Sequence, residues 1–215
     1  SGSARISFEP PVDTGGAAIT SYRVSLLGSS SYKTTASSPF TYTGLTNGRS
    51  YTLQVAAVNA GGKISPYVNA NTVTPRGTPG APTSVRASSL DGSARVSFVA
   101  PTTTGGGTLS YTVRATPGGA TASGSSSPIT LSGLDNGTSY TFVVTATNSF
   151  GNTSSSSAAS SAIFPAATPG VPENVQVVSG RSSVNVSLEA PGDTGGASIT
   201  KYKVLINPGN RVVWS

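Results

Sequence analysis

The chain has 215 residues and a formal net charge of +6, with 9% charged and 35% hydrophobic residues. At a usual domain size of roughly 100–150 residues, this length allows one large domain or two to three small ones. The composition fits neither a charge-rich disordered tail nor a coiled coil. Because the sequence has no His, Cys or Met, a Ser-His-Asp triad, a thiolate nucleophile, a disulfide and a zinc or haem site are excluded.

The positive charge is scattered along the chain. Lys and Arg occur singly, apart from Lys201 and Lys203, which flank Tyr202. A nucleic-acid site would need such charges gathered on one face, so we expect no nucleic-acid partner. No apolar run approaches the roughly 20 residues needed to cross a membrane, and we expect no membrane insertion.

A sequence motif near the start of the chain recurs twice further along. Gly2–Phe8 reads Gly-Ser-Ala-Arg-Ile-Ser-Phe, Gly92–Phe98 differs from it only by Val for Ile, and Arg181–Leu188 is a looser copy. Prolines follow these copies at positions 11, 101 and 191, which gives a spacing of 90 residues. A fixed period of this length indicates an array of similar modules.

Within each module the hydrophobic pattern is that of β-strands. Tyr140, Phe142, Val144 and Ala146 occupy every second position, and a period of two marks a strand with one buried face. Gly- and Pro-rich turn signals separate such runs, and no helical apolar stripe is present. We therefore predict an all-β fold of two-sheet antiparallel sandwiches. The predicted core of the middle module is Val96, Phe98, Tyr111, Val113, Leu134, Tyr140, Phe142, Val144 and Ala146.

Taken together, these motifs resemble the fibronectin type III repeat, and the resemblance covers the whole chain. The middle module has prolines at its entry (Pro79, Pro82), a strand with Val96 and Phe98, and a Gly-Leu pair six residues before Tyr140. It also has a Pro followed by a Gly-Gly loop, a Tyr-x-Val strand and an Ala-x-Asn strand end followed by Gly. The resemblance implies tandem immunoglobulin-like sandwiches with strands A to G.

Two details of the resemblance concern single residues. It implies that Tyr51 and Tyr140 are structural tyrosine-corner residues, with hydroxyls bonded back to the backbone near Leu45 and Leu134. The family usually has Trp where this chain has Phe8, Phe98 and Leu188. A smaller apolar residue can fill that core position when its neighbours repack.

The strand mapping predicts one complete module and two partial ones. We place a module lacking strand A at 1–76, a complete module at 77–167, and a module truncated after strand C′ at 168–215. We expect the chain to be a segment of a longer polypeptide. The alternative is completion of the partial modules by neighbouring chains, but joining the end to the start would supply strands B, C and C′ twice.

Two motifs suggest chemistry and have simpler explanations. Asp-Thr-Gly occurs at Asp13 and Asp193, and pepsin-like proteases pair two such motifs. Here the second copy is the repeat image of the first, and the middle module has Thr103 in that place. The Ser-rich stretch 154–161 is a candidate for O-linked sugars, but we expect it to be polar cover of a loop or edge strand. We predict no catalytic residue, no cofactor and no metal site.

Trp214 is the candidate contact residue, because it aligns with the polar residues Thr34 and Ser123 and so does not replace the core Trp. An exposed aromatic can stack on a sugar ring or a partner protein. It can also cover an edge strand or be buried by a neighbouring module. A polysaccharide is therefore one candidate partner.

The sequence favours a non-enzymatic, extracellular structural array of bacterial type, acting in fibre or filament formation or in surface display. Its partners would be neighbouring copies or further modules of the same polypeptide, and the Pro-rich junction 74–82 would make the array semi-rigid. The alternative functions are linker modules of a secreted polysaccharide-degrading enzyme or adhesin, or a phage tail or decoration protein. Fold alone does not choose among them.

Overall fold

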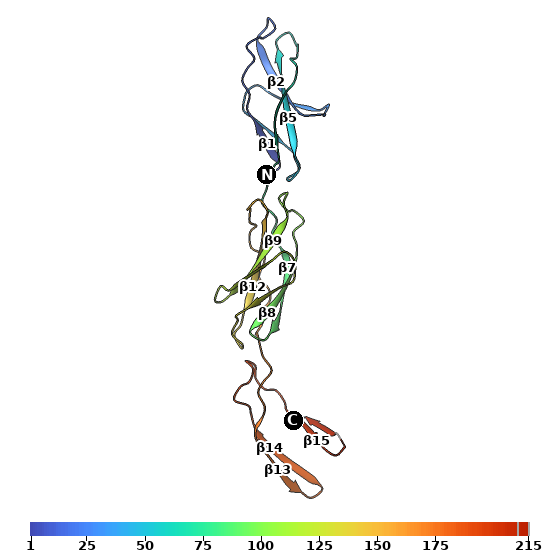
Figure 1. Cartoon of the computed structure of the whole chain (residues 1–215), viewed down its shortest axis with the longest axis vertical. Coiled ribbons are helices and arrows are strands. Elements are labelled where there is room, and N and C mark those ends of the chain that lie inside the picture. The colour runs from blue at the N-terminus through green and yellow to red at the C-terminus, as the bar shows by residue number, and fades with distance from the viewer. Residues whose placement is uncertain (210, 215) are drawn as a thin grey trace. The chain divides into compact units, whose positions relative to one another are not determined.

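The computed structural model describes residues 1–209 and 211–214, and these residues form strands, turns and no helix (Figure 1). The all-β prediction is confirmed. The chain divides into two compact units. The first consists of Ser1–Gly80, Pro101–Ser110 and Ala146–Ser155, and the second of Ala81–Ala100, Tyr111–Thr145 and Ser156–Ser215. The first sequence repeat lies in the first unit, the third lies in the second, and the middle repeat contributes to both.

The first repeat is built from two antiparallel sheets. One has the strand order β3-β2-β5-β6 and the other pairs β1 with β4. Its strands are β1 (Ser3–Ile6), β2 (Ile19–Leu26), β3 (Tyr32–Thr35), β4 (Phe40–Thr43), β5 (Tyr51–Asn59) and β6 (Val68–Val73).

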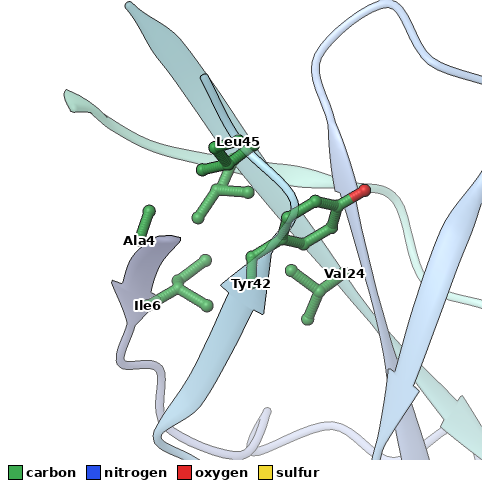
Figure 2. Close-up of a cluster of buried hydrophobic side chains, with 6 residues drawn as sticks. Ala4, Ile6, Val24, Tyr42 and Leu45 are labelled. Carbon is green, nitrogen blue, oxygen red and sulfur yellow. The ribbon is translucent and has the colours of Figure 1, made fainter. Parts of the chain in front are cut away.

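The core of this repeat follows from the alternation of its strands. In β1, Ala4 and Ile6 are buried while Arg5 between them is exposed. Figure 2 shows these two side chains converging with Val24, Tyr42 and Leu45. Burying an aliphatic or aromatic side chain of this size stabilises a fold by about 1.5–3 kcal/mol. This cluster therefore holds the two sheets of the first repeat together.

The middle repeat has the most completely buried core. Its sheets have the strand orders β10-β9-β12 and β11-β8-β7. The strands are β7 (Thr83–Leu90), β8 (Ser93–Val99), β9 (Leu109–Thr116), β10 (Thr121–Gly124), β11 (Ile129–Ser132) and β12 (Thr141–Asn148). Burial along β12 alternates strictly, and all nine residues predicted for this core are buried.

The segment that follows β12 forms a serine ladder, by which we mean Ser154, Ser157 and Ser160. In each, the backbone N–H donates to a β12 carbonyl, as Ser157 does to Val144 at 2.9 Å. Each hydroxyl accepts from the N–H of the same β12 residue, at 2.9–3.1 Å, and donates to the next carbonyl of its own segment. The expectation of polar cover is thus incomplete, because these three serines are buried.

The third repeat consists of two separate hairpins, coloured orange to red in Figure 1. They pair β13 (Glu173–Gly180) with β14 (Ser183–Glu189) and β15 (Lys203–Ile206) with β16 (Arg211–Trp214). Val175 and Val177 of β13 are 57% and 62% exposed. The alternating pattern therefore forms strands here without burying their apolar face.

Candidate functional site

Trp214 lies on the exposed surface of the β15–β16 hairpin. Its side chain is 57% exposed, and it pairs across the hairpin with Lys203. The Nζ of Lys201 is 4.7 Å from the centroid of the indole ring, and the Nζ of Lys203 is 6.0 Å from it. Both distances are within the range of a cation–π interaction, about 6 Å. The residue is therefore an exposed aromatic with two ammonium groups beside its ring.

The first repeat carries a similar pair at the corresponding hairpin. The Arg23 guanidinium on β2 lies 4.1 Å from the ring centroid of Tyr32, which is 46% exposed on β3. In the middle repeat the hairpin has hydroxyls instead, and the Oγ1 of Thr112 is 3.0 Å from the Oγ of Ser123. Sequence reasoning missed the pair Arg23 and Tyr32, because their contact depends on the register of β2 and β3.

These aromatic and basic groups suit a limited range of ligands. An exposed ring offers an apolar face, and a neighbouring ammonium or guanidinium donates hydrogen bonds to hydroxyl or anionic groups. A sugar ring offers both an apolar C–H face and hydroxyl acceptors. Such a ligand would compete with Lys201 for the face of Trp214 that it occupies.

Tyr51 and Tyr140 occupy equivalent positions before or at the start of the strands β5 and β12. The Tyr51 hydroxyl oxygen accepts a hydrogen bond from the backbone N–H of Thr46 at 3.0 Å. The Tyr140 hydroxyl accepts one from the N–H of Asp135 at 3.2 Å. The donors are the residues that directly follow Leu45 and Leu134.

The two tyrosines differ in exposure, because Tyr140 is buried and Tyr51 is half-buried. The hydrogen bond from Thr46 lowers the pKa of Tyr51 below its ordinary value of 10.0, and the nearby Arg49 charge acts in the same direction. A phenolate accepts such a bond more strongly than a phenol does. The interaction stabilises a turn and offers no proton relay to a ligand.

The two Asp-Thr-Gly motifs engage their carboxylates within their own loops. Asp13 Oδ1 accepts a hydrogen bond from the N–H of Gly15, and Asp193 Oδ1 accepts one from Gly195, both at 2.8 Å. These are the local turns that Asp side chains commonly form. Both carboxylates thus fold a glycine-rich loop.

A buried asparagine organises the end of the middle repeat that contains the corresponding glycine-rich loop, at 103–107. Asn148 Nδ2 donates to the carbonyls of Gly77 and Thr104 at 2.9 and 3.1 Å, and its Oδ1 accepts from the N–H groups of Phe150 and Asn152 at 3.2 and 3.0 Å. Sequence reasoning noted the Ala-x-Asn motif without assigning this role. The signal was its recurrence at Asn59, which donates to Thr14 O at 3.0 Å.

An open apolar cleft lies on the first repeat, with a volume of about 350 Å³. Its lining includes Phe8, Tyr22, Val55 and Val68, and Glu9 is its charged member. This volume is at the lower end of small-molecule sites. Among the residues that the structure describes, no group of three or more His, Cys, Asp or Glu side chains could hold a metal ion. The described chain also has no helix long and apolar enough to span a membrane.

Comparison with known proteins gives matches over most of the chain. A family model described as "Fibronectin type III domain" matches residues 1–71 and 80–162. Chitinase A1 of Niallia circulans is 36% identical over 141 residues, which are 61% of this chain and 20% of that protein. Exoglucanase B of Cellulomonas fimi is 30% identical over 191 residues, which are 82% of this chain and 18% of that protein. The chain therefore spans about a fifth of the length of these relatives.

Solved structures also resemble the chain. A crystal structure of domains from titin has a TM-score of 0.43 and 20% identity, covering 75% of this chain and 53% of the other. The FN1–FN3 domains of chicken CNTN1 have a TM-score of 0.42 and 15% identity, covering 99% of this chain and 80% of the other.

Proposed function

Because the chain belongs to the fibronectin type III family, we propose that it is a segment of non-catalytic spacer modules in a secreted bacterial polysaccharide-degrading enzyme. This was the alternative function drawn from the sequence. Both relatives are bacterial proteins whose names denote enzymes acting on polysaccharides. The chain matches only about a fifth of each, so the catalytic activity would reside in other parts of the longer polypeptide.

The observation that carries the proposal is that one segment type occurs in two enzymes with different substrates in their names. A chitinase and an exoglucanase act on different sugar polymers, so the part that they share with this chain does not determine which polymer is cut. A property common to both is the need to reach an insoluble or bulky polymer. A folded spacer meets this need, because a folded repeat keeps its length where a disordered linker collapses.

The side chains are consistent with a spacer. The carboxylates of Asp13 and Asp193 form local turns, and hydroxyl groups cover much of the surface. The absence of Cys, Met and His removes the side chains most sensitive to oxidation and to pH near neutrality. These properties suit a module that works outside the cell for long periods.

The proposal predicts the behaviour of the isolated chain. Residues 1–215 should release no reducing sugar from chitin or cellulose under conditions in which a chitinase or an exoglucanase does. Release of sugar by the purified chain, removed by mutation of Asp13 or Asp193, would contradict the non-catalytic assignment.

The exposed aromatic supports a second function, namely direct contact with the polymer. Trp214 has Lys201 and Lys203 beside its ring, and an aromatic ring with hydrogen-bond donors suits a sugar. Sedimentation with insoluble chitin and cellulose tests this, with Val213→Ala as a control because Val213 neighbours Trp214 on the same strand. Trp214→Ala should abolish the bound fraction, whereas equal sedimentation of both variants would exclude the contact.

Fibre formation and surface display, the first expectation from the sequence, differ from the spacer function in their partner, which would be another copy of the chain. Sedimentation velocity distinguishes the two cases, because a spacer stays monomeric at micromolar concentration and a fibre-forming array does not.

A further inference from the structure

Two glycine motifs recur in the repeats and have no role in the function proposed above. One is the Gly-Gly loop at 15–16, 105–106 and 195–196, and the other is the Asn-Gly turn at 47–48 and 136–137. Within the first compact unit, the backbone of Gly48 lies directly against that of Gly106. A Cβ added at either position would come closer to the other's backbone than Cβ atoms come in real structures.

The second compact unit contains the same contact between Gly137 and Gly196. A Cβ on Gly196 would lie 2.6 Å from the backbone nitrogen of Gly137. All four glycines have φ between +80° and +95°, in the region that L side chains rarely adopt. The contact therefore needs glycine both for space and for backbone conformation.

Backbone hydrogen bonds connect these motifs to the linker that follows each repeat. In the first unit, Gly48 N donates to Pro75 O at 2.8 Å, Gly77 N to Gly105 O at 3.0 Å, and Gly80 N to Thr103 O at 2.9 Å. The three bonds thus tie the linker 75–80 to the turn on one side and to the glycine loop on the other.

The second unit repeats the three bonds at equivalent residues. Gly137 N donates to Pro165 O at 2.9 Å, Ala167 N to Gly195 O at 2.8 Å, and Gly170 N to Asp193 O at 2.9 Å. The recurrence of one bonding pattern in two different sequences shows that it follows from the shared motifs. It does not depend on the particular linker residues, because Gly77 is replaced by Ala167.

The first repeat shows the same loop without a linker bound to it. Gly16 has φ +82° and nothing within 4 Å of an added Cβ. Asn59 donates to Thr14 O, whereas its counterpart Asn148 donates to both Thr104 O and the linker carbonyl of Gly77. Gly16 is therefore a reference position in the same loop motif with no linker against it.

We propose a hydrogen-bonded joint between successive repeats. It is formed by the Asn-Gly turn of one repeat, the linker that follows that repeat and the Gly-Gly loop of the next. The joint converts a Pro- and Gly-containing linker into a part of the folded structure. Its use as a stiff element rests on the proposed spacer function, but its existence does not. Gly106 and Gly196 are its positioning residues, because any side chain there separates the loop from the turn.

The experiment compares Gly106→Ala with the matched control Gly16→Ala in the full 215-residue chain. Both substitutions place a Cβ at a positive φ in the same loop motif, so both strain the backbone alike. Only Gly106→Ala introduces a clash with the turn. Amide hydrogen exchange by NMR reports the joint directly at Gly48 N–H and Gly77 N–H, and the amide of Val144 reports the folding of the middle repeat.

In the unmodified chain and in Gly16→Ala, the Gly48 and Gly77 amides should be protected. In Gly106→Ala their exchange should rise by at least about tenfold, the response to losing roughly 1.4 kcal/mol of local stability, while Val144 stays protected. If Gly106→Ala unfolds the middle repeat, Gly48→Ala breaks the same contact from the other side. It should raise the exchange rate of the Gly77 amide while the Val144 amide stays protected.

Exchange of Gly48 and Gly77 at unprotected rates in the unmodified chain would overturn the joint, and so would equal effects of Gly106→Ala and Gly16→Ala. Either result would leave a flexible spacer possible. Conversely, sugar release by the isolated chain would contradict the spacer function without affecting these amides. The two proposals therefore fail separately.

Discussion

The middle and third repeats place equivalent residues in very different surroundings. Phe98 of β8 is 7% exposed, and its ring centroid lies 4.8 Å from that of Tyr111. Its counterpart Leu188 of β14 is half-buried, and the neighbouring Val184 is 51% exposed. The same local pattern forms a strand in both repeats, but only a second packed sheet makes that strand part of a core. Among the described residues, the middle repeat has two packed sheets, whereas β13 and β14 form a hairpin with no second sheet packed on it.

The largest expected effect sharpens this comparison at the aligned core position. Phe98→Ala should destabilise the middle repeat by about 3–5 kcal/mol, because it removes a buried ring and leaves a cavity. Leu188→Ala should change stability by no more than about 0.5–1 kcal/mol, because this half-buried side chain leaves no enclosed cavity when it is removed. Exchange of core amides in the full chain measures both. Equal losses would show that the third repeat has a core of its own.

The serine ladder is the next most sensitive feature. Ser157→Ala should cost about 1–3 kcal/mol, because it leaves the buried N–H of Val144 without the Ser157 hydroxyl that accepts its hydrogen bond and removes a hydroxyl that fills the space. Ser156→Ala is the matched control, since Ser156 is exposed. Urea denaturation of the two variants checks this, and indistinguishable midpoints would contradict the role of the ladder.

The two tyrosines test burial at equivalent hydrogen bonds. Tyr140→Phe should cost about 1–3 kcal/mol, because the Asp135 N–H is left unpaired in a partly buried site. Tyr51→Phe should cost less than about 1 kcal/mol, because water can reach the Thr46 N–H. Amide exchange within each repeat compares the two losses. A larger loss for Tyr51→Phe would reverse the predicted order.

The smallest effect is the pH dependence of Tyr51. Since folding lowers its pKa, the ionised form favours the folded state, and the resulting stabilisation is complete above pH 10 and is lost as pH falls through the folded pKa. The stability difference between the unmodified chain and Tyr51→Phe should therefore grow from pH 7 towards pH 10. A difference that shrinks over this range would contradict the assigned direction.

The strands and the middle core could be predicted because they depend on a local rule. Alternation placed Phe142, Val144 and Ala146 on one face, and the structure buries all three. The repeat period supplied the number of similar modules, and the combined motifs identified the family. These signals come from residues close together in the sequence.

The serine ladder could not be predicted, because its residues lack the apolar signal on which strand patterns rest. Ser154, Ser157 and Ser160 are three residues apart, and a polar run with this spacing looks like a loop. The pair Arg23 and Tyr32 was missed for another reason. Strand patterns give the face of a side chain but not its neighbours on the next strand, which depend on the register of β2 and β3. In that register Tyr32 pairs with Ser25 and is the diagonal neighbour of Arg23.

The most direct measurement of the proposed spacer function uses the polysaccharide-degrading enzyme in which the proposal places this segment. There the segment is replaced by a Gly/Ser linker of equal residue number. Initial rates are then compared on a soluble oligosaccharide and on the insoluble polymer. The spacer account predicts an unchanged rate on the soluble substrate and a severalfold lower rate on the polymer. Loss of activity on the soluble substrate, or equal rates on the polymer, would contradict it.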